Sequence, residues 1–138
     1  MRETQIGGMK HKEINEAALA QLIPAFYARV REDPLIGPIF DGAVGQWPEH
    51  LEKLQAFWSS VMLKSGRYDG RPLPVHIELG DVVTREAFQR WLALWRETTS
   101  ELLEPAPAAA MQDKAERIAE SLALGIDFYR ERRLDVGA

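Results

Sequence analysis

Three histidines are the side chains of this chain best suited to bind a metal or a cofactor, and their surroundings differ. His11 lies in the polar string 9–13, where a solvent-exposed histidine is expected. His50 lies on the apolar edge of a helical pattern, and His76 follows a segment rich in proline and glycine. A protein zinc site needs about four ligands, and the chain has no cysteine. Two inward histidines therefore make a poor zinc site.

A haem site needs fewer ligands from the protein than a zinc site does. The porphyrin supplies four nitrogens, so the chain needs one axial histidine in an apolar slot with a few polar groups facing it. His76 could serve as that ligand, and Tyr27 and Trp91 could line the slot. Each residue also has a plainer interpretation: His76 as a loop histidine, His50 as a boundary histidine bonded to a backbone carbonyl, and the aromatic side chains as core. Residue chemistry alone leaves both interpretations open.

Composition excludes several other classes. The chain has no phosphate-binding glycine loop, no paired-histidine zinc helix and no cysteine nucleophile. A net charge of −4 argues against nucleic acid as a partner, because nucleic-acid binders concentrate positive charge on one face. We expect no membrane partner, since no run approaches the roughly 20 apolar residues of a membrane helix. The lack of cysteine and of a secretory signal favours the cytoplasm.

Apolar residues recur at helical rather than strand spacing in every long segment, which predicts an all-α chain. Its 138 residues suit a single domain, placed at 13–133 between a flexible leader at 1–12 and a tail at 134–138. A first helix is predicted from the cap residue Asn15. Because proline lacks an N–H and disfavours helical geometry before it, that helix is expected to end near residue 23, with a second beginning at Pro24.

The later part of the chain predicts three further helices. They cover residues 48–63, residues 84–104 after a Thr84 cap, and a last segment from about Pro107. Residues 33–42 are predicted to form a packed corner. Glycines and prolines interrupt the pattern in 66–80, where at most a short helix at 75–79 is expected. The inward-facing residues of the first and last helices are expected to be Leu19, Leu22, Ile23, Phe26, Val30, Met111, Ala115, Ile118, Leu122, Gly125 and Tyr129.

The order of these parts resembles the truncated globins, most closely the third, or P-type, group found in bacteria. The resemblance runs from about Ile14 to Tyr129. It is carried by residues 26–27, 30–31, 35–40, 47–50, 57–58, 68–76 and 88–92. The run Tyr-Asp-Gly-Arg-Pro-Leu-Pro-Val-His that ends at His76 resembles the approach to that group's proximal histidine.

The resemblance implies a two-over-two helical sandwich that binds haem b (iron protoporphyrin IX). Carried over residue by residue, it places His76 on the iron, Phe40 against the porphyrin, and Tyr27, His50 and Trp91 around the distal ligand. The other implied pocket residues are Leu54, Phe57, Trp58 and Phe88. Lys53 and Arg71 are candidate partners of the haem propionates by charge and position, with solvent-exposed cations as the alternative.

Three functions remain open at this stage. The first is reversible binding of small ligands, chiefly dioxygen, but also nitric oxide, carbon monoxide, cyanide or peroxide. The second is redox catalysis, such as nitric-oxide dioxygenation or peroxide turnover, with an unidentified reductase as partner. The third is a helical interaction module that contains no haem.

Overall fold

The computed structural model describes residues 9–68, 70, 72, 76–77 and 82–137 of the chain. Over these ranges the chain is helical, as predicted, apart from turns and one isolated bridge between His11 and Leu103. The helices are α2 (Glu16–Glu32), α3 (Gly37–Ala43), α4 (Trp47–Leu63), α6 (Arg85–Leu102) and α7 (Pro105–Gly137). None of the described helices is long and apolar enough to cross a membrane.

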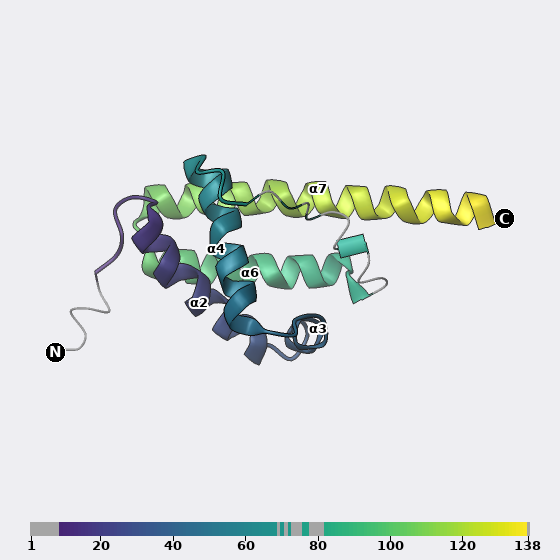
Figure 1. The fold of residues 1–138 in the computed structure, drawn as a ribbon, viewed down its shortest axis with the longest axis horizontal. Coiled ribbons are helices and arrows are strands. Elements are labelled where there is room, and N and C mark those ends of the chain that lie inside the picture. Colours follow the sequence, from purple (N-terminus) through teal and green to yellow (C-terminus); the bar gives the residue numbers. More distant parts are fainter. Residues whose placement is uncertain (1–8, 69, 71, 73–75, 78–81, 138) are drawn as a thin grey trace.

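Two pairs of helices form two layers, which confirms the globin-like sandwich. α2 and α4 cross over α6 and α7, and α3 lies at the end of α2, beside the first turns of α4 (Figure 1). α6 and α7 run antiparallel after a sharp connection at Leu103 and Glu104 (Figure 1). The buried Trp95 indole N–H donates to the Met111 carbonyl at 3.1 Å, so the two helices are joined by a hydrogen bond within the core.

Capping side chains set the starts of two helices as the sequence predicts. The Asn15 side chain accepts a hydrogen bond from the backbone N–H of Ala18 at 2.8 Å, and Thr84 accepts one from Ala87 at 3.0 Å. Each cap satisfies a backbone donor that has no partner within its own helix. Helix α4 begins one residue before Pro48, and proline suits this first turn because its missing N–H would be unpaired there.

The helix break predicted at Pro24 is wrong. Helix α2 continues through this proline from Glu16 to Glu32. Ile23 and Phe26, on either side of it, have 0% of their surface exposed. Proline in a helix interior costs about 3 kcal/mol, but each large apolar side chain that is fully buried contributes about 1.5–3 kcal/mol. Burial on both sides of Pro24 therefore keeps the helix continuous.

Three stacked indoles form the centre of the core. The Trp58 ring of α4 lies 4.6 Å from that of Trp95, and the Trp95 ring lies 5.7 Å from that of Trp91, both on α6. Phe26 of α2 meets Trp91 and Trp95 edge-on, at 5.4 and 4.8 Å between ring centroids. Aromatic pairs favour these stacked and edge-to-face arrangements. The tryptophan stack therefore locks α2, α4 and α6 together.

The packed corner predicted at 33–42 contains α3 and is confirmed. The buried Asp33 carboxylate accepts the backbone N–H groups of Leu35 and Ile36, both at 3.0 Å. Gly37 lies so close to the end of α2 that an added Cβ would stand 2.6 Å from the Arg31 carbonyl oxygen. The corner therefore depends on a residue without a side chain at this position.

The last helix differs from expectation at both ends. It begins at Pro105 rather than near Pro107, a difference within the usual uncertainty of helix ends. Tyr129, predicted to face inward, is 41% exposed, so that prediction is wrong. Tyr129 lies between Asp127, which pairs with Arg85 at 2.6 Å, and Arg130, which donates to the Val83 carbonyl at 3.2 Å. At this point α7 passes the start of α6, and only the last turns of α7 extend beyond it (Figure 1).

The N-terminal segment contacts the helical body before residue 13. The backbone N–H of His11 donates to the Leu102 carbonyl at 2.9 Å, and the N–H of Glu104 donates to the His11 carbonyl at 2.9 Å. The His11 ring also forms a 2.7 Å hydrogen bond with Gln21. The segment around His11 therefore pairs with the connection between α6 and α7.

We expect the change Gly37→Ala to destabilise the protein by about 1–3 kcal/mol, because the added methyl group must displace backbone atoms of α2. Urea unfolding of the purified protein measures the effect. Gly42→Ala is the matched control on the same helix, since a Cβ at Gly42 meets nothing within 4 Å. The control should lose no stability, and equal losses in the two variants would contradict the close approach at Gly37.

Candidate functional site

Four aromatic rings from three helices meet at one end of the sandwich. Tyr27 of α2 lies 5.7 Å from Phe40 of α3, and 6.0 and 6.4 Å from Trp47 and His50 of α4, between ring centroids. Trp47 and His50 in turn meet edge-on at 5.5 Å. We call these four residues the distal cluster. The sequence predicted three of them as site residues, and the structure brings these three together.

Tyr27 is the buried polar group of the distal cluster, with 3% of its surface exposed. Burial raises the pKa of its hydroxyl far above the usual value, so the group stays protonated. The Trp91 side chain acts in the opposite direction on that pKa, as a hydrogen-bond partner. Because an indole can only donate, the Tyr27 oxygen is the acceptor and its O–H remains a donor. Among the residues that the structure describes, no hydrogen bond supplies an acceptor for that O–H.

The surroundings of His50 favour its neutral form. Partial burial, and secondarily the positive charge of Lys53 three residues along α4, lower the pKa of its imidazole. A neutral imidazole carries one donor and one acceptor nitrogen. His50 is half-buried, and its ring lies edge-on to both Tyr27 and Trp47. The side chain is therefore placed between the buried Tyr27 ring and the surface.

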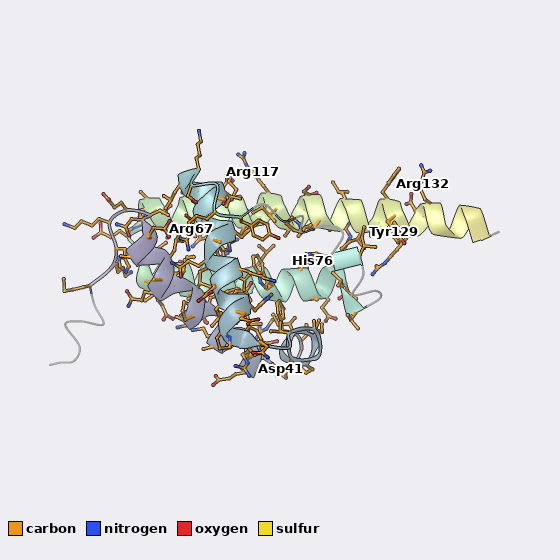
Figure 2. All side chains as sticks on the ribbon, viewed as in Figure 1. Asp41, Arg67, His76, Arg117, Tyr129 and Arg132 are labelled. Atoms are coloured by element: carbon orange, nitrogen blue, oxygen red, sulfur yellow. The ribbon has the colours of Figure 1, made fainter. Side chains whose placement is uncertain are left out.

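His76 has the hydrogen bond that an axial ligand needs. Its Nδ1 lies 2.7 Å from the Pro72 carbonyl oxygen, which can only accept, so Nδ1 carries the proton. The lone pair is then on Nε2, the nitrogen left for a metal. The His76 ring also stacks on Phe88 of α6, at 6.4 Å between centroids and 23° between planes. Figure 2 shows His76 beside α6. Both contacts fix the orientation of the ring.

One face of α6 connects the histidine to the distal cluster. Phe88, which carries the His76 ring, and Trp91, which interacts with Tyr27, are three residues apart and therefore neighbours on the helix surface. The residues that the structure describes fit a haem group: a histidine whose Nε2 bears the lone pair, a buried hydroxyl for which these residues supply no acceptor, and apolar rings on the elements between them.

An ion pair between a buried carboxylate and an exposed guanidinium holds the corner that carries Phe40. Arg90 of α6 donates from Nε to the Asp33 carboxylate at 2.5 Å. Burial alone would raise the pKa of the Asp33 carboxyl, but hydrogen bonds from the Ile36 backbone and from Arg90 outweigh burial and lower that pKa. The corner between α2 and α3 is thereby fixed to the helix that bears Trp91. Asp33 is a positioning residue that the sequence reasoning missed.

A second polar cluster holds the chain that leaves α4 toward His76. The buried Ser59 hydroxyl lies 2.5 Å from the Glu16 carboxylate and 2.7 Å from the Ser65 hydroxyl. Arg67 donates to the other oxygen of Glu16 at 2.6 Å. The hydrogen bond from Ser59 is the largest of the contacts that lower the pKa of Glu16. These bonds anchor the start of the connecting segment to the first turn of α2.

The remaining predicted site residues occupy different environments. Leu54 is half-buried, Phe57 lies edge-on to Trp58 and Tyr68 at 5.5 and 5.3 Å, and Trp58 is buried in the tryptophan stack. Lys53 is exposed on α4, one turn from His50. Arg71 lies outside the described residues, as does most of the short helix predicted at 75–79.

Trp47 is a site residue that the sequence reasoning did not assign. It contacts both Tyr27 and His50, and the Arg31 guanidinium lies 4.6 Å above its ring. The signal was present, because Trp47 begins the Trp-Pro-Glu-His run that contains His50. A tryptophan at the first turn of an apolar helix is commonly core, so the spacing alone did not single it out.

Comparisons with known proteins give one consistent family. No family model matches the chain. The chain is 35% identical over 115 residues to the group 3 truncated hemoglobin ctb of Campylobacter jejuni, a match that covers 80% of this chain and 90% of that protein. It is also similar to the crystal structure of group III truncated hemoglobin from Campylobacter jejuni. That match has a TM-score of 0.81 and 33% identity, over 86% of this chain and 95% of the other.

We expect Lys53→Ala to raise the pKa of His50 toward about 6.5 without reaching it, because burial still disfavours the charged ring. NMR titration of the imidazole ring protons measures this value. Lys114→Ala on α7 is the charge-matched control and should leave the His50 titration unchanged. An equal pKa in the wild type and Lys53→Ala would show that Lys53 does not act on the ring.

The same shift has a consequence for stability. The folded-state pKa of His50 lies below its ordinary value, so the unfolded chain binds the proton more readily. The stability that comes from His50 is therefore complete above about pH 6.5 and declines as the pH falls through the folded-state pKa.

Proposed function

This chain belongs to the group III truncated haemoglobins, a family of haem-binding globins, and we propose that it binds haem b through His76 and holds dioxygen or related small ligands next to Tyr27. The observation that carries the proposal is the presence of two complementary groups against one face of α6. His76 offers an unprotonated Nε2, and Tyr27 offers a buried O–H for which the described residues supply no acceptor.

On the proximal side, His76 acts through its fixed tautomer. The Pro72 carbonyl accepts the Nδ1 proton, which raises the basicity of Nε2 as an iron ligand. Phe88 stacks against the ring and restricts its rotation. The protein thereby holds the histidine in one orientation rather than leaving it to rotate as a loop side chain.

Haem iron supplies a site for diatomic ligands and for one-electron chemistry. On the distal side, the Tyr27 hydroxyl donates to a ligand that carries partial negative charge, and Trp91 polarises this O–H by donating to its oxygen. A hydrogen bond to a charged acceptor is worth about 1.5–3 kcal/mol. Trp91 thus supports Tyr27, in addition to any direct contact with the ligand.

His50 can act in two ways that the neutral imidazole permits. Its donor nitrogen can face the ligand beside Tyr27. Alternatively, the ring can turn outward and open a path from the surface to the ligand site. Lys53, one turn further along the exposed side of α4, is the proposed partner of a haem propionate. Arg71 stays a second proposed partner from its position in the sequence.

A redox role is the second proposed function. A buried donor slows ligand release, and slow release suits consumption of dioxygen better than its delivery. Nitric oxide would be the co-substrate of dioxygen, or peroxide would be the substrate of a separate reaction, with a reductase as the electron-donating partner. Dioxygen release and a single turnover with nitric oxide separate the two functions. Slow release with rapid nitrate formation supports the enzyme, whereas release much faster than any nitrate formation supports reversible binding.

Replacing His76 with Ala should accelerate haem loss by a factor of about 100 or more, because the axial bond is removed while the fold remains. Transfer of haem to an excess of apomyoglobin, followed by absorbance, measures the rate. His50→Ala should change the rate far less, and His11→Ala is the surface control. Equal haem loss from the His76 and His50 variants would contradict the axial assignment.

Replacing Tyr27 with Phe should accelerate dioxygen dissociation by a factor of about 10–100, since one hydrogen bond to a partly charged acceptor is lost. Stopped-flow measurement on the ferrous protein gives this rate. Tyr68→Phe removes a hydroxyl from the ring that lies against Phe57, outside the distal cluster, and should leave dissociation unchanged. An unaltered rate in Tyr27→Phe would show that Tyr27 does not donate to the ligand.

A further inference from the structure

The C-terminal half of α7 exposes large apolar side chains on the side that faces away from α6. Leu124 and Phe128 are 54% and 60% exposed, whereas Ala123 and Ile126 on the inner side are buried. This part of the helix passes the first residue of α6, where Asp127 pairs with Arg85 at 2.6 Å, and the last turns of α7 project beyond α6 (Figure 1). Exposed leucine and phenylalanine one turn apart form a small apolar patch, and the Arg132 guanidinium lies over the Phe128 ring at 5.6 Å from its centroid.

Five residues continue this patch along one line of the helix. Arg117, Ser121, Leu124, Phe128 and Glu131 follow one another at intervals of four, three, four and three. That alternation is the spacing of a helix face that packs against another helix. All five side chains are exposed. We call this line the outer seam, and Figure 2 shows Arg117 near one end of it.

A shallow hollow lies beside the seam and is lined in part by Arg117, Glu120, Ser121 and Leu124. These four positions are i, i+3, i+4 and i+7, the set that surrounds one inserted side chain in knobs-into-holes packing. Ser121 is the small residue of the seam and one of the residues that line the hollow. The seam thus carries an exposed ring, Phe128, and also a hollow of the kind that receives a side chain from a facing helix.

We propose that the outer seam binds a second copy of this chain, with the two α7 helices antiparallel and Leu124 at the two-fold axis. Leu124 is the middle residue of the seam, seven positions from each end. An antiparallel pairing about it places Leu124 against Leu124 and Phe128 of each copy at the Ser121 hollow of the other. It also places Arg117 opposite Glu131. The seam is therefore complementary to itself in charge.

A parallel arrangement does not have this complementarity. It would place Arg117 next to Arg117 and Glu131 next to Glu131, and like charges in register are unfavourable. In the monomer Arg117 pairs with Asp113 at 3.1 Å, and both side chains are largely exposed. Such an exposed pair contributes little, so Arg117 can exchange partners at low cost. Charge thus selects the antiparallel pairing.

The seam offers two large apolar side chains per copy, which is less than a permanent dimer needs. The association is therefore reversible and depends on concentration. It leaves the distal cluster and His76 outside the contact, since both lie on the side of the sandwich formed by α2, α4 and the inner face of α6. The interface is independent of the haem site.

Sedimentation of the full-length, haem-loaded protein over a range of concentrations tests the proposal. The wild type should change from monomer to dimer as concentration rises. Phe128→Glu should weaken this association at least tenfold, because it replaces the inserted ring with a charge. Met9→Glu is the control, a matched charge on a side chain that is 77% exposed away from the seam. A wild type that is monomeric throughout, or a dimer that survives Phe128→Glu, overturns the proposal.

A charge-reversal cycle tests the antiparallel register. Arg117→Glu and Glu131→Arg should each weaken dimerisation, because each places like charges opposite one another, and the double variant should restore it. Absorbance spectra of all variants should remain those of the haem-loaded wild type. If the double variant associates no better than the single variants, the proposed register is wrong. If a seam variant loses haem, the claimed independence from the haem site is wrong.

Discussion

The stack of Trp58, Trp95 and Trp91 is the contact on which the rest of the sandwich depends. It joins α4 to α6 through parallel ring faces, and Phe26 of α2 closes it from the side. Large planar side chains in fixed orientation leave little freedom for the helices to rotate about their axes. The crossing of the two layers follows from this packing, and so does the direction in which each helix presents its remaining side chains.

The chemistry of the site begins where the stack ends. Trp91 is its last ring, and its indole N–H interacts with Tyr27 rather than with the core. The same side chain thus serves packing through its faces and hydrogen bonding through its edge. Asp33 and Arg90 hold the neighbouring corner against α6, and Glu16, Ser59 and Arg67 hold the segment that leaves α4. Polar contacts at the two ends of the sandwich therefore position groups that the apolar core alone would leave loose.

Local signals allowed most of the fold to be predicted. Asn15, Pro48 and Thr84 mark helix starts through backbone hydrogen bonding that neighbouring residues decide. Pro24 misled because its effect on the backbone is local, whereas the burial that overrides it involves side chains from other helices. Tyr129 misled because the periodic pattern continues to the point where α7 passes the start of α6, and there the side chain is only partly covered.

The candidate site was less predictable, because its contacts join residues far apart in the chain. Residue chemistry alone left His76 undecided, and the family resemblance supplied its assignment. Neither gave the orientation of the ring, which depends on the Pro72 carbonyl and on Phe88 of another helix. Trp47 was passed over because its role rests on Tyr27 and Arg31, both of which come from α2.

The placement of the tryptophans also allows their intrinsic fluorescence to report haem binding. All four indoles of the chain lie in α4 and α6, the helices that surround the proposed haem site. Haem absorbs light in the range where indoles emit and quenches them by energy transfer over tens of ångströms. We therefore expect tryptophan fluorescence to be weak in the haem-bound protein and strong in the haem-free protein. The core that holds the helices together also reports, without any added label, whether the cofactor is in place.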